Sequence, residues 1–372
     1  MHITIIAGAR PNFMKIAPII HAIHAAQKEQ KSIHYRLVHT GQHHDPGMSD
    51  HFFTQLGIPM PDANLEAHGG TQAEQTGVIM TRFERELQEN PTDLVLVVGD
   101  VTSTMACTIT AKKMCTPVAH VEAGIRSGDM TMPEEINRVV TDSICDHFFT
   151  TSEIANANLR NTGIPENRIH FVGNTMIDTL YQNIHRLQRP DFWASYELEP
   201  QAYLLLTLHR PANVDDPSHL QRLLEAILEG TQQKIIFPVH PRTRKSLENI
   251  DFGHERLLQV SPMSYLEFMY LIQHCKGVIT DSGGITEETT VLGIPCVTLR
   301  NSTERPETIL MGTNELAGTD PSALAPYLEK MSSGSWKKGN IPPLWDGHTA
   351  ERIIHTLLSL NTVPNRTYAY AK

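Results

Sequence analysis

The sequence predicts an α/β protein built from two Rossmann-like, doubly wound domains. Apolar runs typical of strands alternate with amphipathic helical segments along the whole of its 372 residues. Several runs, such as LVLVVG at 94–99, are almost unbroken Val and Leu, which is typical of parallel strands buried on both faces. The length is sufficient for two domains of ordinary size, each with its own core.

The first domain begins with a strand and contains six predicted strands. They are His2–Gly8, Tyr35–Thr40, Leu94–Gly99, Pro117–Val121, His147–Thr150 and Ile169–Gly173. Amphipathic helices lie between them, such as Phe13–Gln27, in which large apolar side chains recur at helical spacing. Another helix is expected over Val101–Lys113, and Pro133 is well placed at the first position of a further one.

A polar segment separates two series of strands. Over Gln188–Gln201 the polarity rises and two prolines occur, which indicates a linker between domain 1–190 and domain 191–372. The second domain contains the predicted strands Tyr203–Leu208, Ile235–Val239, Leu257–Val260, Val278–Thr280 and Cys296–Leu299. Its C-terminal helix is a candidate to pack back on the first domain. Because such sheets bind ligands at the carboxyl ends of their strands, we expect the active site in the interdomain cleft.

Composition excludes several classes of function. The net charge is -10 and no run rich in Lys or Arg occurs, so we expect no nucleic-acid partner. No apolar run approaches the roughly 20 residues that span a bilayer, and the start MHITIIAGARPN does not resemble a secretion signal. The five cysteines are scattered and form no C-x-x-C motif, which fits reduced thiols in a cytoplasmic protein.

The sequence predicts no metal and no nicotinamide cofactor. Among 20 histidines the best local candidate for a metal site is His43-His44-Asp45, but adjacent histidines without cysteine are not typical of zinc ligation. A G-x-G-x-x-G motif, the fingerprint of dinucleotide binding, does not occur in the chain.

The segment Gly277–Val291, GVITDSGGITEETTV, gives the clearest ligand signal. Its β-branched run ends in Asp-Ser-Gly-Gly, and a segment compatible with a helix follows from about Thr286. Two glycines before a helix N-terminus allow backbone N–H groups to approach a phosphate closely. Glu287 and Glu288 then fall in the first turn, where a carboxylate can complement the helix dipole or bind ribose hydroxyls. The alternative is a tight strand-to-helix turn with nothing bound.

Basic and acidic residues follow the strands of the first domain. Arg10 and Lys15, after the first strand, suit anion recognition, although both could be solvated surface charges. Asp100 follows a buried strand, where it could be catalytic or could cap the next helix. Glu122 stands at the end of an apolar strand, and Glu134 opens a helix. These three acids could converge on one cleft.

Histidines end two successive strands of the second domain. His209 lies in LTLHRPANV and His240 in FPVHPRTR, each close to an arginine. One such histidine alone is more often a core or surface residue, but two at successive strand ends favour a functional site.

These motifs together resemble the non-hydrolysing UDP-N-acetylglucosamine 2-epimerase family. The resemblance covers nearly the whole chain through TGQHHD, GDVTST, HVEAGIRSG, PEEINR, FVGNTMIDTL, LTLHRPANV, PVHPRTR, DSGGITEE and TERPET. It implies a two-domain glycosyltransferase-B-like fold, an isomerase that interconverts UDP-GlcNAc and UDP-ManNAc, no cofactor, a homodimer, and a role in cell-surface polysaccharide synthesis.

The resemblance also assigns roles to residues. The catalytic residues it implies are Asp100, Glu122, Glu134 and His209, and the substrate-binding residues are Arg10, Lys15, His240, Phe268, Ser282, Gly283, Gly284 and Glu288. Asp100 is the preferred candidate for the base that removes the C2 proton, but the sequence does not decide which carboxyl is acid and which is base.

Four alternatives stay open from the sequence. They are a hydrolysing epimerase that releases ManNAc, an epimerase of a related UDP-2-acetamido sugar, a retaining glycosyltransferase, and a nucleotide-sugar-binding protein without catalysis.

Overall fold

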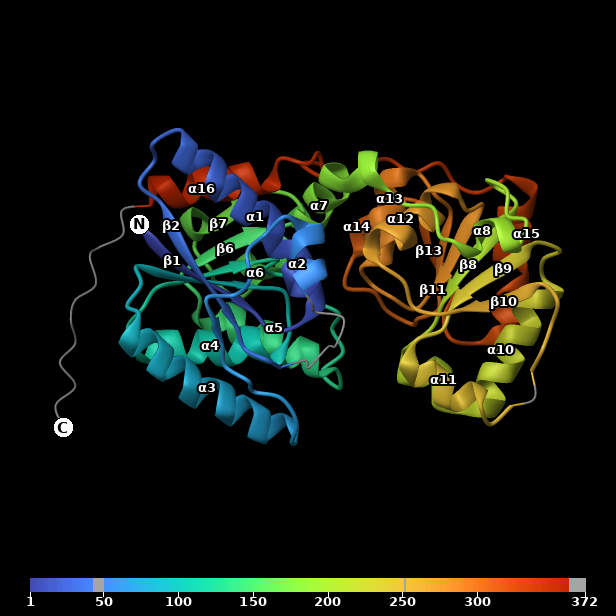
Figure 1. Ribbon diagram of the computed structural model, residues 1–372, viewed down its shortest axis with the longest axis horizontal. Helices are drawn as coiled ribbons and strands as arrows, with labels where there is room; N and C mark the ends of the chain where they lie inside the picture. The colour runs from blue at the N-terminus through green and yellow to red at the C-terminus, as the bar shows by residue number, and fades with distance from the viewer. Residues whose placement is uncertain (43–49, 251, 361–372) are drawn as a thin grey trace. The chain divides into compact units, whose positions relative to one another are not determined.

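The computed structural model describes residues 1–42, 50–250 and 252–360, and the chain divides into two compact units (Figure 1). Unit 1 is Met1–Thr179 together with the segment from Pro343 onward, and unit 2 is Leu180–Pro342. The sequence placed the division at residue 190. In the structure it falls within helix α7 (Thr175–Asn183), where the Thr179 hydroxyl donates to the Met14 carbonyl of unit 1 while Leu180 packs in the core of unit 2.

Unit 1 is built on a parallel sheet of seven strands in the order β3-β2-β1-β4-β5-β6-β7. The strands are β1 His2–Ala7, β2 His34–His39, β3 Ala63–Asn64, β4 Leu94–Val98, β5 Val118–Val121, β6 His147–Thr150 and β7 Ile169–Phe171. All six strands expected from the sequence are present, and among the described residues the short edge strand β3 is the one addition. The central strand β4 is buried at every position, as its run of Val and Leu predicts.

Helices cover both faces of this sheet. They are α1 Arg10–Lys28, α2 Asp50–Leu56, α3 Gln72–Glu89, α4 Thr102–Lys113, α5 Pro133–Ile144, α6 Glu153–Asn161, α7 and α16 Thr349–Ser359, with the 3-10 turn η1 Glu166–Arg168; the turn η2 Ile184–Arg186 belongs to unit 2. Helices α1 and α16 pack together on one face, and α3, α4 and α5 form a row on the other (Figure 1). The last described helix therefore completes the unit that contains β1.

Unit 2 is a second parallel sheet, with six strands in the order β10-β9-β8-β11-β12-β13. The strands are β8 Tyr203–Thr207, β9 Lys234–Pro238, β10 Leu257–Val260, β11 Gly277–Thr280, β12 Cys296–Thr298 and β13 Asn314–Leu316. Its helices are α8 Phe192–Ser195, α9 Pro211–Val214, α10 Pro217–Glu229, α11 Pro241–Leu247, α12 Tyr265–His274, α13 Ile285–Leu292, α14 Pro306–Leu310, η3 Pro321–Ala323 and α15 Ala325–Ser333. The two parallel sheets confirm the α/β class predicted from the sequence.

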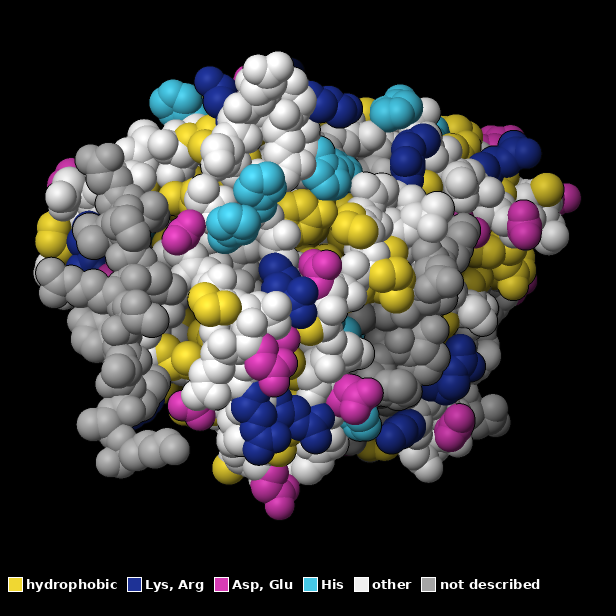
Figure 2. Space-filling model, turned by 60° about the vertical axis from the view of Figure 1, so that its left-hand side comes forward, with side chains coloured by type: hydrophobic (Ala, Val, Ile, Leu, Met, Phe, Trp, Pro, Cys, Tyr) yellow, Lys and Arg dark blue, Asp and Glu magenta, His cyan; other side chains and the backbone are white. Residues whose placement is uncertain are grey.

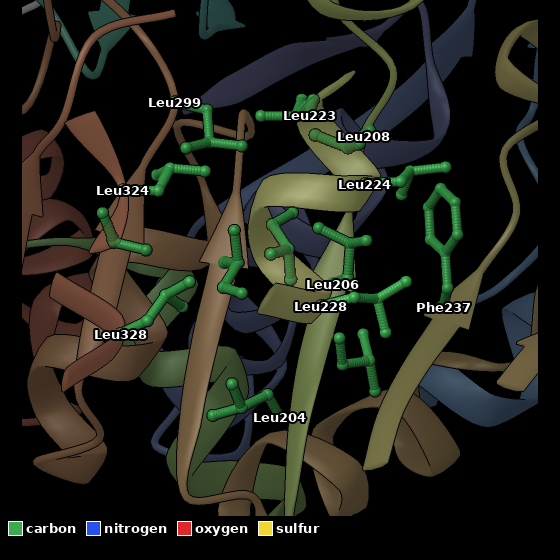
Figure 3. Close-up of a cluster of buried hydrophobic side chains, with 14 of the residues drawn as sticks. Leu204, Leu206, Leu208, Leu223, Leu224, Leu228, Phe237, Leu299, Leu324 and Leu328 are labelled. Carbon is green, nitrogen blue, oxygen red and sulfur yellow. The ribbon is translucent and has the colours of Figure 1, made fainter. Parts of the chain in front are cut away.

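Leucines fill the core between this sheet and α10. Side chains of β8, α10 and β9 interdigitate there, as Figure 3 shows for Leu204, Leu206, Leu223, Leu228 and Phe237. Burying each such side chain contributes on the order of 1.5–3 kcal/mol, so this layer fixes the position of β8 and of the residues that follow it.

Residues 188–201, expected to be a linker, instead pack on unit 2. Trp193 of α8 is 7% exposed, and the edge of its ring faces Tyr203 at 5.7 Å and Tyr270 at 5.4 Å between ring centroids. An aromatic side chain of this size anchors its segment by burial.

The strand order reverses between β1 and β4 in unit 1 and between β8 and β11 in unit 2. Ligands of doubly wound sheets bind at the carboxyl ends of strands beside such a switch point. Arg10 and Asp100 follow β1 and β4, and His209 and Ser282 follow β8 and β11. Each unit therefore presents predicted site residues at its switch point.

On the face drawn in Figure 2, Lys and Arg side chains are interspersed with Asp and Glu, and hydrophobic side chains lie in separate small groups. No helix among the described residues is long and apolar enough to cross a membrane.

Candidate active site

Glu122 and Lys15 meet at the carboxyl edge of the unit 1 sheet. Glu122 directly follows β5, its side chain is 2% exposed, and its Oε2 lies 2.6 Å from Lys15 Nζ on α1. The backbone of Glu122 has φ +69°, a left-handed conformation that non-glycine residues rarely adopt. Lys15, predicted to bind an anion, is therefore the partner of a predicted catalytic acid in this structure.

Gly99 lies next to this pair. It directly follows β4 and has φ +67°, and a Cβ there would lie 3.3 Å from Lys15 Nζ and 3.9 Å from Glu122 Oε2. Both the backbone conformation and the close approach favour glycine at this position.

Asp100, the next residue, is held by an arginine of α5. Its Oδ2 accepts hydrogen bonds from Arg138 Nη2 at 2.6 Å and Nε at 3.0 Å, and its side chain is 31% exposed. The N-cap of α4 is Val101. Asp100 therefore does not cap that helix, which was the alternative role expected from the sequence. The two donors favour the ionised carboxylate while leaving it accessible.

The two neighbouring acids of α5 differ in their surroundings. Glu135 is buried and accepts from the backbone N–H groups of Ser127 and Gly128 and from Arg138 Nη1. Burial alone would raise the pKa of Glu135, but these donors outweigh it and the pKa is lowered. The side chain of Glu134 is partly exposed. Glu135 is thus fully engaged by protein donors, whereas the side chain of Glu134 is partly accessible.

Arg10 opens α1, and its guanidinium stacks 5.0 Å above the ring of Phe52. This cation–π contact orients the group at the carboxyl end of β1.

In unit 2, His209 is paired with a buried aspartate. Asp281 is 0% exposed, and its Oδ1 lies 2.8 Å from His209 Nδ1. The same carboxylate accepts the backbone N–H groups of His209 and Arg210 and the Asn213 amide. Burial raises the pKa of Asp281, but His209 and the backbone donors outweigh burial and lower it. The ionised carboxylate therefore fixes a hydrogen on Nδ1 of His209, whose side chain is 38% exposed.

His240 lies beside His209, with 5.7 Å between ring centroids. It is the N-cap of α11, and its Nδ1 accepts the backbone N–H of Arg242 at 3.2 Å. Burial and the neighbouring His209 lower the pKa of His240. A neutral ring with Nδ1 as acceptor carries its hydrogen on Nε2, which can donate to a ligand oxygen.

The predicted phosphate cradle precedes α13. Gly284 is the N-cap of that helix, and no described residue accepts from the backbone N–H groups of Gly283 or Gly284. The N–H of Ser282 is already used, because it donates to the Thr280 hydroxyl at 2.9 Å. Two glycine N–H groups and the helix terminus remain for an anion.

Glu288 lies in the first turn of α13, after the cradle, and is almost fully buried. Its Oε1 accepts from the Tyr265 hydroxyl at 2.9 Å. Burial raises the pKa of Glu288 to about 8, so the carboxyl group is largely uncharged at neutral pH. Phe268 lies one turn along α12 from Tyr265. Both side chains are partly buried against the core cluster of unit 2 that contains Trp193 and Tyr203.

The sequence did not identify Asp281, Arg138 or Tyr265, which hold His209, Asp100 and Glu288 respectively. A signal existed for Asp281, since a charged residue at the end of the apolar run Val278–Thr280 is unusual without a partner. The metal candidate His43-His44-Asp45 lies outside the described residues. Within the part of the chain that is described, no three His, Cys, Asp or Glu side chains are grouped to hold a metal ion.

Known proteins resemble this chain along most of its length. A family model described as UDP-N-acetylglucosamine 2-epimerase matches residues 25–358. The UDP-N-acetylglucosamine 2-epimerase of Methanocaldococcus jannaschii is 39% identical over 371 residues, which cover 96% of this chain and 99% of that protein. The UDP-2,3-diacetamido-2,3-dideoxy-D-glucuronate 2-epimerase of Pseudomonas aeruginosa is 40% identical over 322 residues, covering 86% and 88%.

Solved structures agree with these relatives. A crystal structure of the Methanocaldococcus jannaschii UDP-GlcNAc 2-epimerase in complex with UDP-GlcNAc and UDP matches with a TM-score of 0.85 and 39% identity, covering 96% of this chain and 99% of that one. Together with the two parallel sheets, the match confirms the predicted glycosyltransferase-B-like fold.

Proposed function

This chain belongs to the UDP-N-acetylglucosamine 2-epimerase family, and we propose that it interconverts UDP-GlcNAc and UDP-ManNAc without releasing free sugar. It is accordingly an isomerase. The proposal goes beyond family membership in two respects, the non-hydrolysing course of the reaction and the identity of the sugar.

The proposed reaction is elimination and re-addition of UDP. The C2 hydrogen of an N-acetylhexosamine is not next to a carbonyl group, so its direct removal as a proton is difficult. Departure of UDP first gives C1 oxocarbenium character, which makes the C2 proton acidic enough for a carboxylate. The products of this half-reaction are a 2-acetamidoglucal and UDP. Re-addition of UDP, with a proton delivered to the opposite face of C2, gives the epimer.

The observation that carries this proposal is the arrangement of Asp100 and Glu122. They follow the adjacent parallel strands β4 and β5, and each is held in place by a cation. Two positioned carboxyl groups at one sheet edge are what proton transfer at a single carbon requires. We assign Asp100 as the base, because Arg138 favours its ionised form and its side chain is accessible. Glu122 and Glu134 are the candidates for the second proton transfer.

The leaving diphosphate needs cationic and N–H partners. His209, Gly283 and Gly284 are proposed to supply them, since His209 is oriented by Asp281 and the glycine N–H groups face no described acceptor. Arg10 is proposed to bind the phosphates as well. His240, Phe268, Ser282 and Glu288 are proposed to bind the nucleoside and its phosphates. Lys15 is proposed to bind the phosphate while it keeps its ion pair with Glu122.

NMR of UDP-GlcNAc incubated with the protein in D2O tests the function. We expect UDP-ManNAc with deuterium at C2, formed equally in the presence of EDTA and without added nicotinamide. Free ManNAc plus UDP would identify the hydrolysing reaction. A protein that leaves the C2 hydrogen of UDP-GlcNAc unexchanged would contradict the proposal.

A second candidate substrate is a UDP-2-acetamido sugar with a further acetamido group and a carboxylate. The observation in its favour is the 40% identity to the Pseudomonas aeruginosa relative, which is named for a diacetamido glucuronate. Comparison of kcat/KM for the two UDP-sugars separates them.

The homodimer, the cytoplasmic location and the role in cell-surface polysaccharide synthesis are further proposals, supported by the family resemblance alone. Light scattering coupled to gel filtration tests the first of these.

A further inference from the structure

A buried histidine connects the two strand ends that carry the proposed acids. His120 lies on β5 with its side chain 0% exposed. Its Nε2 is 2.8 Å from the carbonyl oxygen of Gly99, and its Nδ1 is 2.7 Å from Asp142 Oδ1 on α5. Neither His120 nor Asp142 has a role in the proposed reaction.

His120 is held through both of its ring nitrogens. A carbonyl oxygen only accepts, so Nε2 donates to Gly99. Nδ1 faces the buried carboxylate of Asp142. Burial raises the pKa of Asp142, but His120 and Arg126 outweigh burial and lower it. The ring is therefore fixed between a backbone carbonyl and a carboxylate.

The other oxygen of Asp142 holds the turn after β5. Asp142 Oδ2 accepts from the backbone N–H of Gly124 at 3.0 Å and from Arg126 Nη1 at 2.6 Å. The carboxylate is 2% exposed and is surrounded by donors. It therefore ties the turn that contains Glu122 to His120, and His120 ties it onward to Gly99.

Both ends of this connection lie in turns that contain a residue with positive φ. Gly99, the residue before Asp100, has φ +67°, and Glu122 itself has φ +69°. Non-glycine residues in the left-handed region persist only where the surrounding structure holds them. The His120–Asp142 pair is bonded to Gly99 on one side and to Gly124 on the other, so it is placed to hold both turns.

We propose that His120 and Asp142 are positioning residues, which fix Asp100 and Glu122 relative to each other for proton transfer at C2. The pair touches neither substrate nor reacting atoms and acts through the backbone of the two turns. This inference rests on the proposed function, because it gives the pair a purpose in that reaction.

The variants His120→Gln and Asp142→Asn test the inference. Gln can still donate to the Gly99 carbonyl but lacks the second ring nitrogen, and Asn cannot accept from all the donors around Asp142. Displacement of the acids by about 1 Å should lower kcat by roughly 10²-fold. UDP affinity, measured by calorimetry, should be unchanged, because the hydrogen bonds of the pair go to Gly99, Gly124 and Arg126, none of which is a proposed nucleotide ligand.

Asp178→Asn is the matched control. Asp178 is another buried aspartate of unit 1, which accepts the backbone N–H groups of Thr349 and Ala350 at the start of α16. This variant should lose stability while keeping kcat. Equal losses of kcat in Asp178→Asn and Asp142→Asn would overturn the inference, because the effect would then be general destabilisation.

Two readouts separate this inference from the proposed function. NMR of protein with isotope-labelled histidine, assigned by its difference from His120→Gln, should show a hydrogen on Nε2 of His120, the nitrogen that faces the Gly99 carbonyl. A bare Nε2 would overturn the inference without any assay of turnover. If the wild-type protein fails to exchange the C2 hydrogen of UDP-GlcNAc, the proposed function fails. If it does exchange it, while both variants keep wild-type kcat, the inference alone fails.

Discussion

At the scale of single residues, side-chain partners fix the orientation of the proposed catalytic groups. Glu122 is bonded to Lys15, and His209 is bonded to Asp281, which is 0% exposed. Fixed partners of this kind lower the cost of reorganising charge during a reaction. Substitutions of the proposed catalytic residues should consequently affect turnover more than UDP binding, whereas substitutions of the proposed phosphate ligands should affect both.

The first prediction separates chemistry from nucleotide binding. Asp100→Asn and His209→Ala should lower turnover by roughly 10²–10⁴-fold, the usual contribution of a proton-transfer group. Ser282→Ala and Arg10→Ala should weaken UDP binding as well, since both residues are proposed to contact the nucleotide. Calorimetric titration with UDP, run beside turnover assays, measures both effects. Near-normal turnover of Asp100→Asn would move the role of base to Glu122 or Glu134.

The second prediction concerns pH and Glu288. Its folded-state pKa of about 8 lies above the unfolded value of 4.5, because burial penalises the charged form more than the Tyr265 hydroxyl stabilises it. The folded protein therefore holds a proton that the unfolded chain releases, so this group makes the free energy of unfolding fall as the pH rises from 4.5 to about 8. Glu288→Gln, which keeps an acceptor for Tyr265, should flatten that fall in denaturant titrations.

Glu255→Gln, at an exposed position of the same unit, is the control and should leave the pH dependence unchanged. An identical fall in the wild type and in Glu288→Gln would show that Glu288 is already ionised when folded.

The sequence identified candidate residues more readily than their partners. Glu122 and His209 could be named because each follows an apolar strand. Their partners could not be assigned, because Lys15 is 107 residues from Glu122 and Asp281 is 72 residues from His209 along the chain. Such pairs form only when separate strands become neighbours in a sheet.

At the scale of secondary structure, long apolar runs were predicted well and short elements were not. The expected strand 94–99 is Leu94–Val98 in the structure, because its unbroken Val and Leu suit a strand buried on both faces. The edge strands Ala63–Asn64 and Asn314–Leu316 have two and three residues, too few to produce a pattern. Trp193 was assigned to a linker because its burial depends on Tyr203 and Tyr270, which lie outside the segment 188–201.

The third prediction tests the start of α13 as an anion site. Gly284 has helical angles, φ -69° and ψ -40°, and a Cβ there would meet no described atom within 4 Å. Gly284→Ala should therefore fold normally and gain up to about 1 kcal/mol, because alanine loses less chain entropy. UDP binding should nevertheless weaken, because the methyl group would stand where a phosphate approaches.

Gly77→Ala provides the comparison for this variant. Gly77 lies within α3 of unit 1, and a Cβ there also has open space. It should show the same stabilisation in thermal melts with unchanged UDP affinity. Full UDP affinity in Gly284→Ala would contradict the phosphate cradle.

At the scale of the whole molecule, unit 1 is assembled from both ends of the described chain. After unit 2, the chain returns at Pro343 and is bonded to unit 1 at several points. Trp345 Nε1 donates to the Thr151 carbonyl at 2.9 Å, and Asp178 caps the start of α16. Ile353 and Leu357 of that helix are 0% exposed.

The fourth prediction follows from this return. A chain that ends at Pro342 loses the buried side chains of Trp345, Ile353, Ile354 and Leu357. At about 1.5–3 kcal/mol each, the loss is comparable with the roughly 5–15 kcal/mol that stabilises a typical protein. Calorimetric melting should show unit 1 unfolded and unit 2 retained. The full-length protein, which keeps α16, is the comparison and should show both units unfolding on heating, whereas a native unit 1 in the shorter chain would refute the prediction.

The same discontinuity sets an order of events during synthesis on the ribosome. Domains usually fold one after another as they emerge, beginning with the N-terminal one. Of the two units, unit 1 is started before unit 2 and finished after it, because α16 emerges only after every residue of unit 2. The surface of α1 that α16 covers therefore stays exposed on the nascent chain while unit 2 buries its core, and the arrival of α16 completes the unit that was started earlier.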